Sequence, residues 1–121
     1  MNEFNELRFW AKIKKRPELY LGQRSIVRLD IFIKGISYAL NYNHDTFSYF
    51  NGFDDWYMEK QKVDIRNGYV IWWNHILYIN GNQDDVAFDF FIRYFEKYLK
   101  EIHNVTLPDV IGGIELKNFD Y

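Results

Sequence analysis

The chain has no cysteine, and only two of its 121 residues are proline. Without thiols it cannot form disulfides, hold zinc through thiolates or use a cysteine nucleophile. No apolar run approaches the roughly 20 residues that a membrane helix needs. The longest run, GYVIWWNHILYI, is interrupted by Asn74 and His75. The first residues of the chain are polar and charged, unlike the apolar core of a secretion signal. We therefore expect a cytoplasmic protein with no membrane segment.

Motifs for catalysis and for metal binding are also missing. The sequence contains no Walker loop, no G-x-G-x-x-G fingerprint and no G-x-S-x-G elbow. Its three histidines, His44, His75 and His103, have no second ligand-type residue at metal-binding spacing on a helix. The acid pairs at 54–55 and 84–85 suit helix starts, where carboxylates complement the helix dipole. We therefore expect no enzymatic activity, no cofactor and no bound metal.

Aromatic residues are abundant, with 4 Trp, 10 Tyr and 11 Phe making up 21% of the chain. This supply can build a hydrophobic core, so we expect residues 1–121 to form a single domain. The charge is uneven: residues 1–28 carry seven Lys/Arg against three Asp/Glu, a net +4, whereas the remainder carries eight against fourteen, a net −6. The whole chain is not basic enough for a general nucleic-acid binder, and its acidic remainder suits a basic protein partner.

Helical periodicity predicts three helices in the first half of the chain. The first covers residues 3–15 and stops at Arg16-Pro17, because the residue before a proline disfavours the helical conformation. The second covers residues 25–42 and begins at Ser25, a favourable N-cap residue. A short third helix is expected within residues 53–62, after a loop-like stretch.

The most regular pattern predicts a helix over residues 84–103. Asn82 is a candidate N-cap for it, and Asp85, three residues later, would complete a weak capping box. Opposite charges four residues apart are expected to stabilise the predicted helices through the pairs Asp30–Lys34, Asp89–Arg93 and Glu96–Lys100.

Residues 69–79 fit two structures. Their aromatic and β-branched composition favours a strand, whereas the lack of a second convincing strand favours a helix, because a lone strand leaves its backbone groups unpaired. The tail is expected to be irregular, with a turn at Gly112-Gly113. The predicted fold class is therefore mainly α, a compact single-domain bundle of four to five helices with an irregular C-terminal tail. The alternative is an α+β fold with a short strand near residues 69–79.

The stretch KIKKRPELYLGQRSIVRL, residues 12–29, joins a basic run to a tight connection. Its structural interpretation is that Pro17 ends one helix, Gly22 permits a sharp turn and Ser25 caps the next helix. Basic side chains in such a run more often lie in solvent at the end of a helix than bind phosphate. A nucleic-acid-associated small adaptor that uses residues 12–28 is the alternative function, and its first basic residues are Lys12, Lys14, Lys15 and Arg16.

A longer resemblance covers residues 16–98. The motifs RPELYLG, LDIFIKG, FDDWYMEK and DDVAFDFFIRYFEKY occur in that order. They are similar to those of a family of small bacterial proteins with an R-P-x-M-Y-L-G start, although Glu18-Leu19 stands where that family has Gly-Met. Such proteins resemble immunity proteins of polymorphic toxin systems, including contact-dependent growth inhibition. The resemblance implies a protein that binds and neutralises a cognate toxin domain by occlusion, and it carries over no functional residue.

An occluding protein needs a complementary surface and no catalytic site. Many toxin domains are nucleases with basic clefts, so an acidic and aromatic surface would complement them. The alternative is that the aromatic members are partly core and the acids cap helices. Eight residues are candidates for this partner-binding surface: Asp54, Asp55, Trp56, Tyr57, Glu59, Asp84, Asp85 and Asp89.

Overall fold

A computed structural model describes residues 5–40, 47–63 and 70–110 of the chain. In these ranges it contains six α-helices, a π-helical turn and no β-strand, which confirms the mainly α fold class. The elements are α1 (Glu6–Lys15), α2 (Pro17–Leu21), α3 (Ile26–Ala39), α4 (Phe53–Gln61), α5 (Trp72–Ile79), α6 (Asp84–Tyr98) and the π-helical turn η1 (Leu99–His103). No helix in these ranges is long and apolar enough to cross a membrane.

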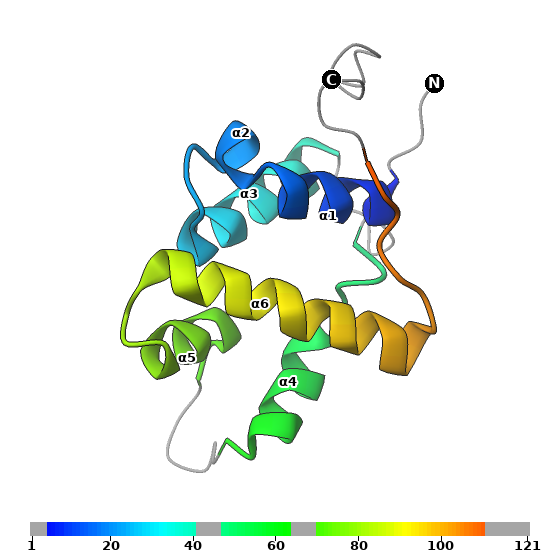
Figure 1. Ribbon diagram of the computed structural model, residues 1–121. Helices are drawn as coiled ribbons and strands as arrows, with labels where there is room; N and C mark the ends of the chain where they lie inside the picture. The colour runs from blue at the N-terminus through cyan, green and yellow to red at the C-terminus, as the bar shows by residue number, and fades with distance from the viewer. Residues whose placement is uncertain (1–4, 41–46, 64–69, 111–121) are drawn as a thin grey trace.

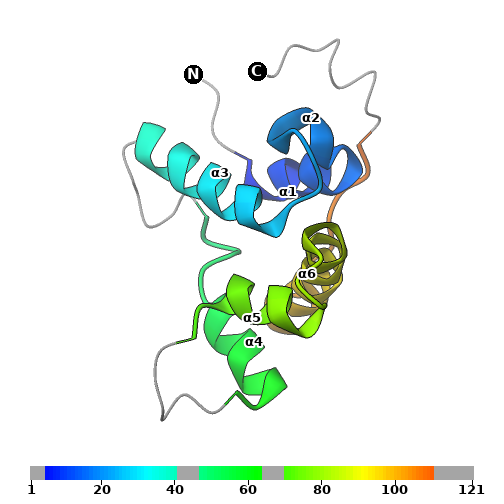
Figure 2. The ribbon, with the colours of Figure 1, turned by 90° about the vertical axis from the view of Figure 1, so that its left-hand side faces the viewer.

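Helix α6 is the centre of the fold. Figures 1 and 2 show α1, α2 and α3 on one side of it, and α4 and α5 on the other. A helix can pack on both sides only if its apolar face is broad. This helix meets that need, since it buries Ala87, Phe88, Phe91, Ile92, Phe95 and Tyr98.

Aromatic rings join the two sides of the molecule. Phe53, the first residue of α4, is fully buried, and its ring contacts seven other aromatic rings. On the other side of α6, Trp10 is also fully buried, with its ring centroid 4.6 Å from that of Phe95. Edge-to-face and offset arrangements of this kind stabilise a core beyond the area that they bury.

The connection between the first two long helices contains an extra helix. Helix α1 ends at Lys15 as predicted, but Pro17 starts the five-residue α2. Proline suits a first helical position, because its missing N–H has no acceptor there. Gly22 ends α2 with φ at 84°, and a Cβ at this position would lie 2.6 Å from Nη1 of Arg28. The predicted turn and the predicted Ser25 cap are both confirmed, since the Ser25 hydroxyl accepts from the Arg28 N–H.

The ambiguous segment is helical from Trp72 to Ile79, and residues 70–71 before it have no regular structure. Helix α5 buries Trp72 and Ile76, which are four residues apart and therefore share one helix face. Residue 69 lies outside the described ranges, as do residues 41–42 of the second predicted helix. Residues 104–110 have no regular structure, and the Gly112-Gly113 turn lies outside the described residues.

The predicted capping box before α6 is wrong. Gln83 occupies the N-cap position and makes no side-chain cap, while Asn82 adopts a left-handed conformation with φ at 60°. The Asn82 N–H donates to the carbonyl of Leu77, so Asn82 satisfies a carbonyl group in the last turn of α5 and does not cap α6.

Long-range partners replace two of the three predicted ion pairs. Asp30 pairs with Lys34 at 2.9 Å, as expected. The carboxylates of Asp89 and Glu96 instead contact Arg24, in the connection before α3, and Lys14, on α1. Asp89 and Glu96 therefore form ion pairs with distant parts of the chain and not with the predicted partners on their own helix.

Candidate functional site

The structure sorts the eight candidate residues into internal and external positions. Five of them belong to α4 and three to the first two turns of α6. All three α6 members contact residues near the start of α3, whereas the three acids on α4 make no ion pair among the described residues.

Asp84 caps a helix other than its own. Its Oδ1 accepts a hydrogen bond of 2.7 Å from the backbone N–H of Ile26, and its Oδ2 accepts from the hydroxyl of the buried Ser25. The first N–H groups of a helix lack partners within that helix, and a carboxylate there also complements the helix dipole. The structure therefore assigns Asp84 to the joint between α6 and α3.

Replacing Asp84 with alanine is expected to lower the free energy of unfolding by about 1–3 kcal/mol, because the substitution removes a charged acceptor from partly buried donors. Urea denaturation measures this change. Asp85→Ala is the matched control: Asp85 is its neighbour, its side chain is 56% exposed, and its loss should cost no more than about 0.5 kcal/mol. Equal costs for the two variants would contradict the capping role.

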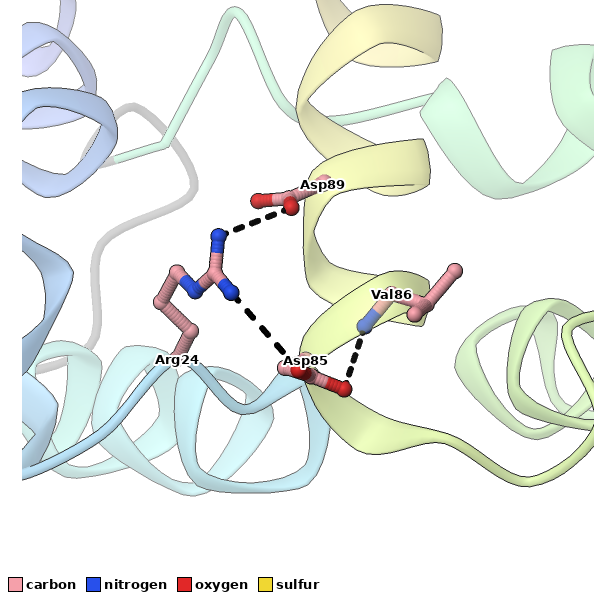
Figure 3. Close-up of polar contacts among 4 residues, drawn as sticks. All are labelled: Arg24, Asp85, Val86 and Asp89. Carbon is pink, nitrogen blue, oxygen red and sulfur yellow. Dashed lines mark hydrogen bonds and ion pairs between the residues drawn. The ribbon is translucent and has the colours of Figure 1, made fainter.

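Asp85 and Asp89 share one arginine. Figure 3 shows the Arg24 guanidinium between their carboxylates, with Nη1 2.9 Å from Asp89 Oδ2 and Nη2 3.6 Å from Asp85 Oδ2. The other oxygen of Asp85 accepts from the N–H of Val86. All three charged side chains are about half exposed, so the pairs add little stability. Arg24 thus offsets one of the three negative charges in the first two turns of α6.

Tyr57 belongs to the core. It is fully buried, and its hydroxyl lies 2.7 Å from Nδ1 of His75. Burial raises the pKa of Tyr57 far above its ordinary value, and burial lowers the pKa of His75. A neutral imidazole whose Nδ1 accepts a hydrogen bond from the Tyr57 hydroxyl fits both shifts.

Trp56 is half-buried on the neighbouring position of α4. Its ring packs against those of Tyr94 and Tyr98, and the ammonium of Lys60 lies 5.7 Å from its centroid. The hydrogen bond from Lys60 to Glu101, which measures 3.0 Å between Nζ and Oε1, lowers the pKa of Glu101. Trp56 thus stands at the edge of the core with part of its surface accessible.

Asp54, Asp55 and Glu59 form what we call the α4 acidic face. All three side chains are exposed, and none pairs with a basic side chain in the part of the chain that the structure describes. Asp54 Oδ1 accepts from the Asp55 N–H, a local contact within the first helical turn. Of the predicted surface, Asp85 and Asp89 are exposed but paired with Arg24, whereas the α4 acidic face is exposed and has no basic partner among the described residues.

The basic stretch that begins the chain is largely engaged within the fold. Lys14 pairs with Glu96, and Arg16 pairs with Glu18. Arg28 donates to the carbonyl of Leu21 at 3.0 Å. These contacts, together with the Arg24 cluster, favour the structural interpretation of residues 12–29.

Glu6 holds the turn that precedes α4, and no pattern in the sequence indicates this role. This carboxylate is 6% exposed and accepts three hydrogen bonds: from Trp10 Nε1 at 2.9 Å, and from the N–H groups of Tyr49 and Phe50 at 2.7 and 2.9 Å. The Tyr98 hydroxyl donates to the Asn51 carbonyl at 2.9 Å. The turn that leads into α4 is therefore fixed from both α1 and α6.

The histidines have separate surroundings. His44 lies outside the described residues, His75 contacts Tyr57, and the His103 ring lies edge-on to the rings of Tyr49 and Tyr98. Within the described ranges, no three His, Asp or Glu residues are grouped so that they could hold a metal ion.

No protein-family model, curated protein or solved structure matches this chain.

Proposed function

We propose that this chain is an immunity protein that binds one cognate toxin domain and occludes its working surface. The α4 acidic face is the observation that supports this most: three exposed carboxylates on one helix have no basic partner in the described residues. Unpaired charge of one sign attracts a surface of opposite sign. The motif order across residues 16–98 supports the same class of function.

The supports of α4 suit a binding surface. Glu6 and Tyr98 hold the turn before the helix, and Phe53 anchors the first turn in the core. A surface that is already ordered loses little conformational entropy when it binds. The half-buried Trp56 adds aromatic area beside the acids, and aromatic residues commonly supply binding energy at interfaces.

Co-expression tests the proposal. The proposal predicts that a neighbouring gene encodes a large secreted protein whose C-terminal domain arrests growth when it is expressed alone. We expect this chain to restore growth and to co-purify with that domain. A toxic domain that this chain neither neutralises nor binds would refute the proposed function.

Charge removal on α4 tests the surface. The variant Asp54→Asn/Asp55→Asn is expected to slow association with the toxin domain by about tenfold at low ionic strength, because exposed charges act mainly on the association rate. Stopped-flow fluorescence measures the rate.

The matched control is Glu18→Gln/Asp109→Asn, which removes the same charge from two other exposed positions. It should change the rate by less than about twofold, since it leaves the α4 acidic face intact. Equal slowing by both variants would show that net charge, and not this face, governs association.

A further inference from the structure

The outer side of α6 carries a row of basic residues. Figure 2 views this helix nearly along its axis and shows that no other helix covers its outer side. Arg93, Lys97 and Lys100 are exposed there, and their spacing of four and three residues places them on one face of α6 and of the π-helical turn that continues it. At about 1.5 Å per residue, this α6 basic row is about 10 Å long.

The α6 basic row has a surplus of positive charge. None of its members forms an ion pair among the described residues. The acids that border the row each pair with a cation outside it: Asp89 with Arg24, Glu96 with Lys14 and Glu101 with Lys60. Asp85 shares Arg24 with Asp89, which leaves one negative charge near the start of α6 against three positive charges in the row. The pKa of Glu101 is lowered mainly by Lys60 and to a smaller extent by Lys97, so Glu101 leaves most of the charge of the row uncompensated.

The α4 acidic face does not cover this surplus. Trp56 and Lys60 are the α4 residues that reach the rings of α6 and the carboxylate of Glu101. Asp55 and Glu59 each precede one of these residues, so each points about 100° away from it around the helix. The two faces of opposite charge are therefore separate surfaces.

Two half-buried aromatic rings flank the α6 basic row. The rings of Phe90 and Tyr94 stack with their centroids 4.4 Å apart. The guanidinium of Arg93 lies 5.8 Å from the Phe90 centroid, and the ammonium of Lys97 lies 5.7 Å from the Tyr94 centroid. Tyr94 also contacts rings of α4, whereas Phe90 contacts no further aromatic ring in the described ranges. Phe90 thus has a face on which another flat ring can stack.

We propose that the α6 basic row binds single-stranded nucleic acid, with phosphates on Arg93, Lys97 and Lys100 and one base stacked on Phe90. Proteins that bind single strands without sequence preference combine a positive track for the backbone with aromatic rings on which bases stack. Both components lie side by side on this helix. The site is independent of the α4 acidic face and of the basic residues 12–28.

An acidic protein segment fits this surface less well. Its carboxylates would pair with the three cations but would leave the aromatic flank without a partner. A nucleic-acid strand uses both, because its phosphates meet the cations and its bases meet the rings.

The test uses the full-length chain and a fluorescently labelled oligothymidylate of about 12 nucleotides, with binding followed by fluorescence anisotropy. We expect a dissociation constant of about 100 µM at about 50 mM salt, and three phosphate contacts predict an affinity about twentyfold lower at about 200 mM salt. The same strand without its bases should bind about tenfold more weakly, because it has no ring to stack on Phe90.

Three variants locate the site. Lys97→Gln/Lys100→Gln should weaken binding about tenfold at low salt and reduce the salt dependence to about a third. The matched control Lys15→Gln/Lys62→Gln removes the same charge from two exposed lysines that also lack ion pairs among the described residues, and it should change the affinity by less than about twofold. Phe90→Leu keeps an apolar side chain and should abolish the difference between the strands with and without bases.

Four results would each overturn the proposal. The first is no binding at about 500 µM protein and low salt. The second is equal weakening by the two double variants, which would make net charge the cause. The third is equal binding of the strand without bases to the natural protein. The fourth is equal displacement of the strand by poly-glutamate of the same charge, which would identify a site for acidic protein segments.

Discussion

Replacing Phe53 with alanine is expected to lower the free energy of unfolding by about 3–5 kcal/mol, because the substitution removes a fully buried ring and leaves a cavity. The ring contacts residues of α4, α5, α6 and the preceding turn, so neighbouring side chains cannot collapse into the space without disturbing one another. Small domains are stable by only about 5–15 kcal/mol, so a substantial fraction of this variant should unfold on modest warming. Urea denaturation, followed by tryptophan fluorescence and circular dichroism, measures the loss.

Tyr78→Ala is the control for Phe53. Tyr78 is also an aromatic residue on a helix, but it is 75% exposed, and its loss should change stability by no more than about 0.5 kcal/mol. If the two variants unfolded at the same urea concentration, Phe53 would not be the central residue of the core.

The helices that the sequence predicts well are those whose signals are local. Residues 84–103 repeat apolar side chains every three or four positions, and a helix and a π-helical turn cover them. Ser25 caps α3 because its hydroxyl reaches the N–H three residues later. Helix α2 was missed because five residues are too few to show a period.

The roles of residues whose hydrogen-bond partners lie far away in the sequence could not be predicted. In the sequence, Glu6 looks like an acid in the first turn of a helix, yet its backbone partners lie 43 and 44 residues away. Asp84 lies in an acid pair at a helix start, yet it caps a helix that begins 58 residues earlier. A buried carboxylate and an exposed one look alike in a sequence, because only the tertiary contacts distinguish them.

The difference between buried and exposed side chains also explains why the partner-binding surface in the structure is smaller than the predicted one. The sequence offered eight candidates for partner binding, and their charge alone did not indicate which of them are accessible to a partner. Burial assigns Tyr57 to the core, and hydrogen bonds assign Asp84 to the α3 joint. The proposed contact surface is consequently smaller than the predicted one and lies on α4.

Replacing Glu6 with alanine is expected to lower the free energy of unfolding by about 2–4 kcal/mol at neutral pH. The indole N–H of Trp10 and the backbone N–H groups of Tyr49 and Phe50 would lose their acceptor, and an unsatisfied buried donor costs about 1–3 kcal/mol before water relaxes into the space. Hydrogen exchange at the amides of Tyr49 and Phe50 should accelerate in the same variant. Glu18→Ala, which removes an exposed acid from the first turn of α2, is the control and should cost no more than about 0.5 kcal/mol.

The effect of Glu6 should depend on pH in a defined direction. Burial raises its pKa above the ordinary value of 4.5, although hydrogen bonds from Trp10, Tyr49 and Phe50 oppose the rise. The folded protein then holds this proton more tightly than the unfolded chain. The associated stability is fully present below pH 4.5 and is lost as the pH rises through the raised pKa. The stability difference between the natural protein and Glu6→Ala should therefore be larger near pH 4 than near pH 7, as urea midpoints measured at both values will test. A difference that widened toward neutral pH would mean that the three hydrogen bonds outweigh burial and keep Glu6 ionised.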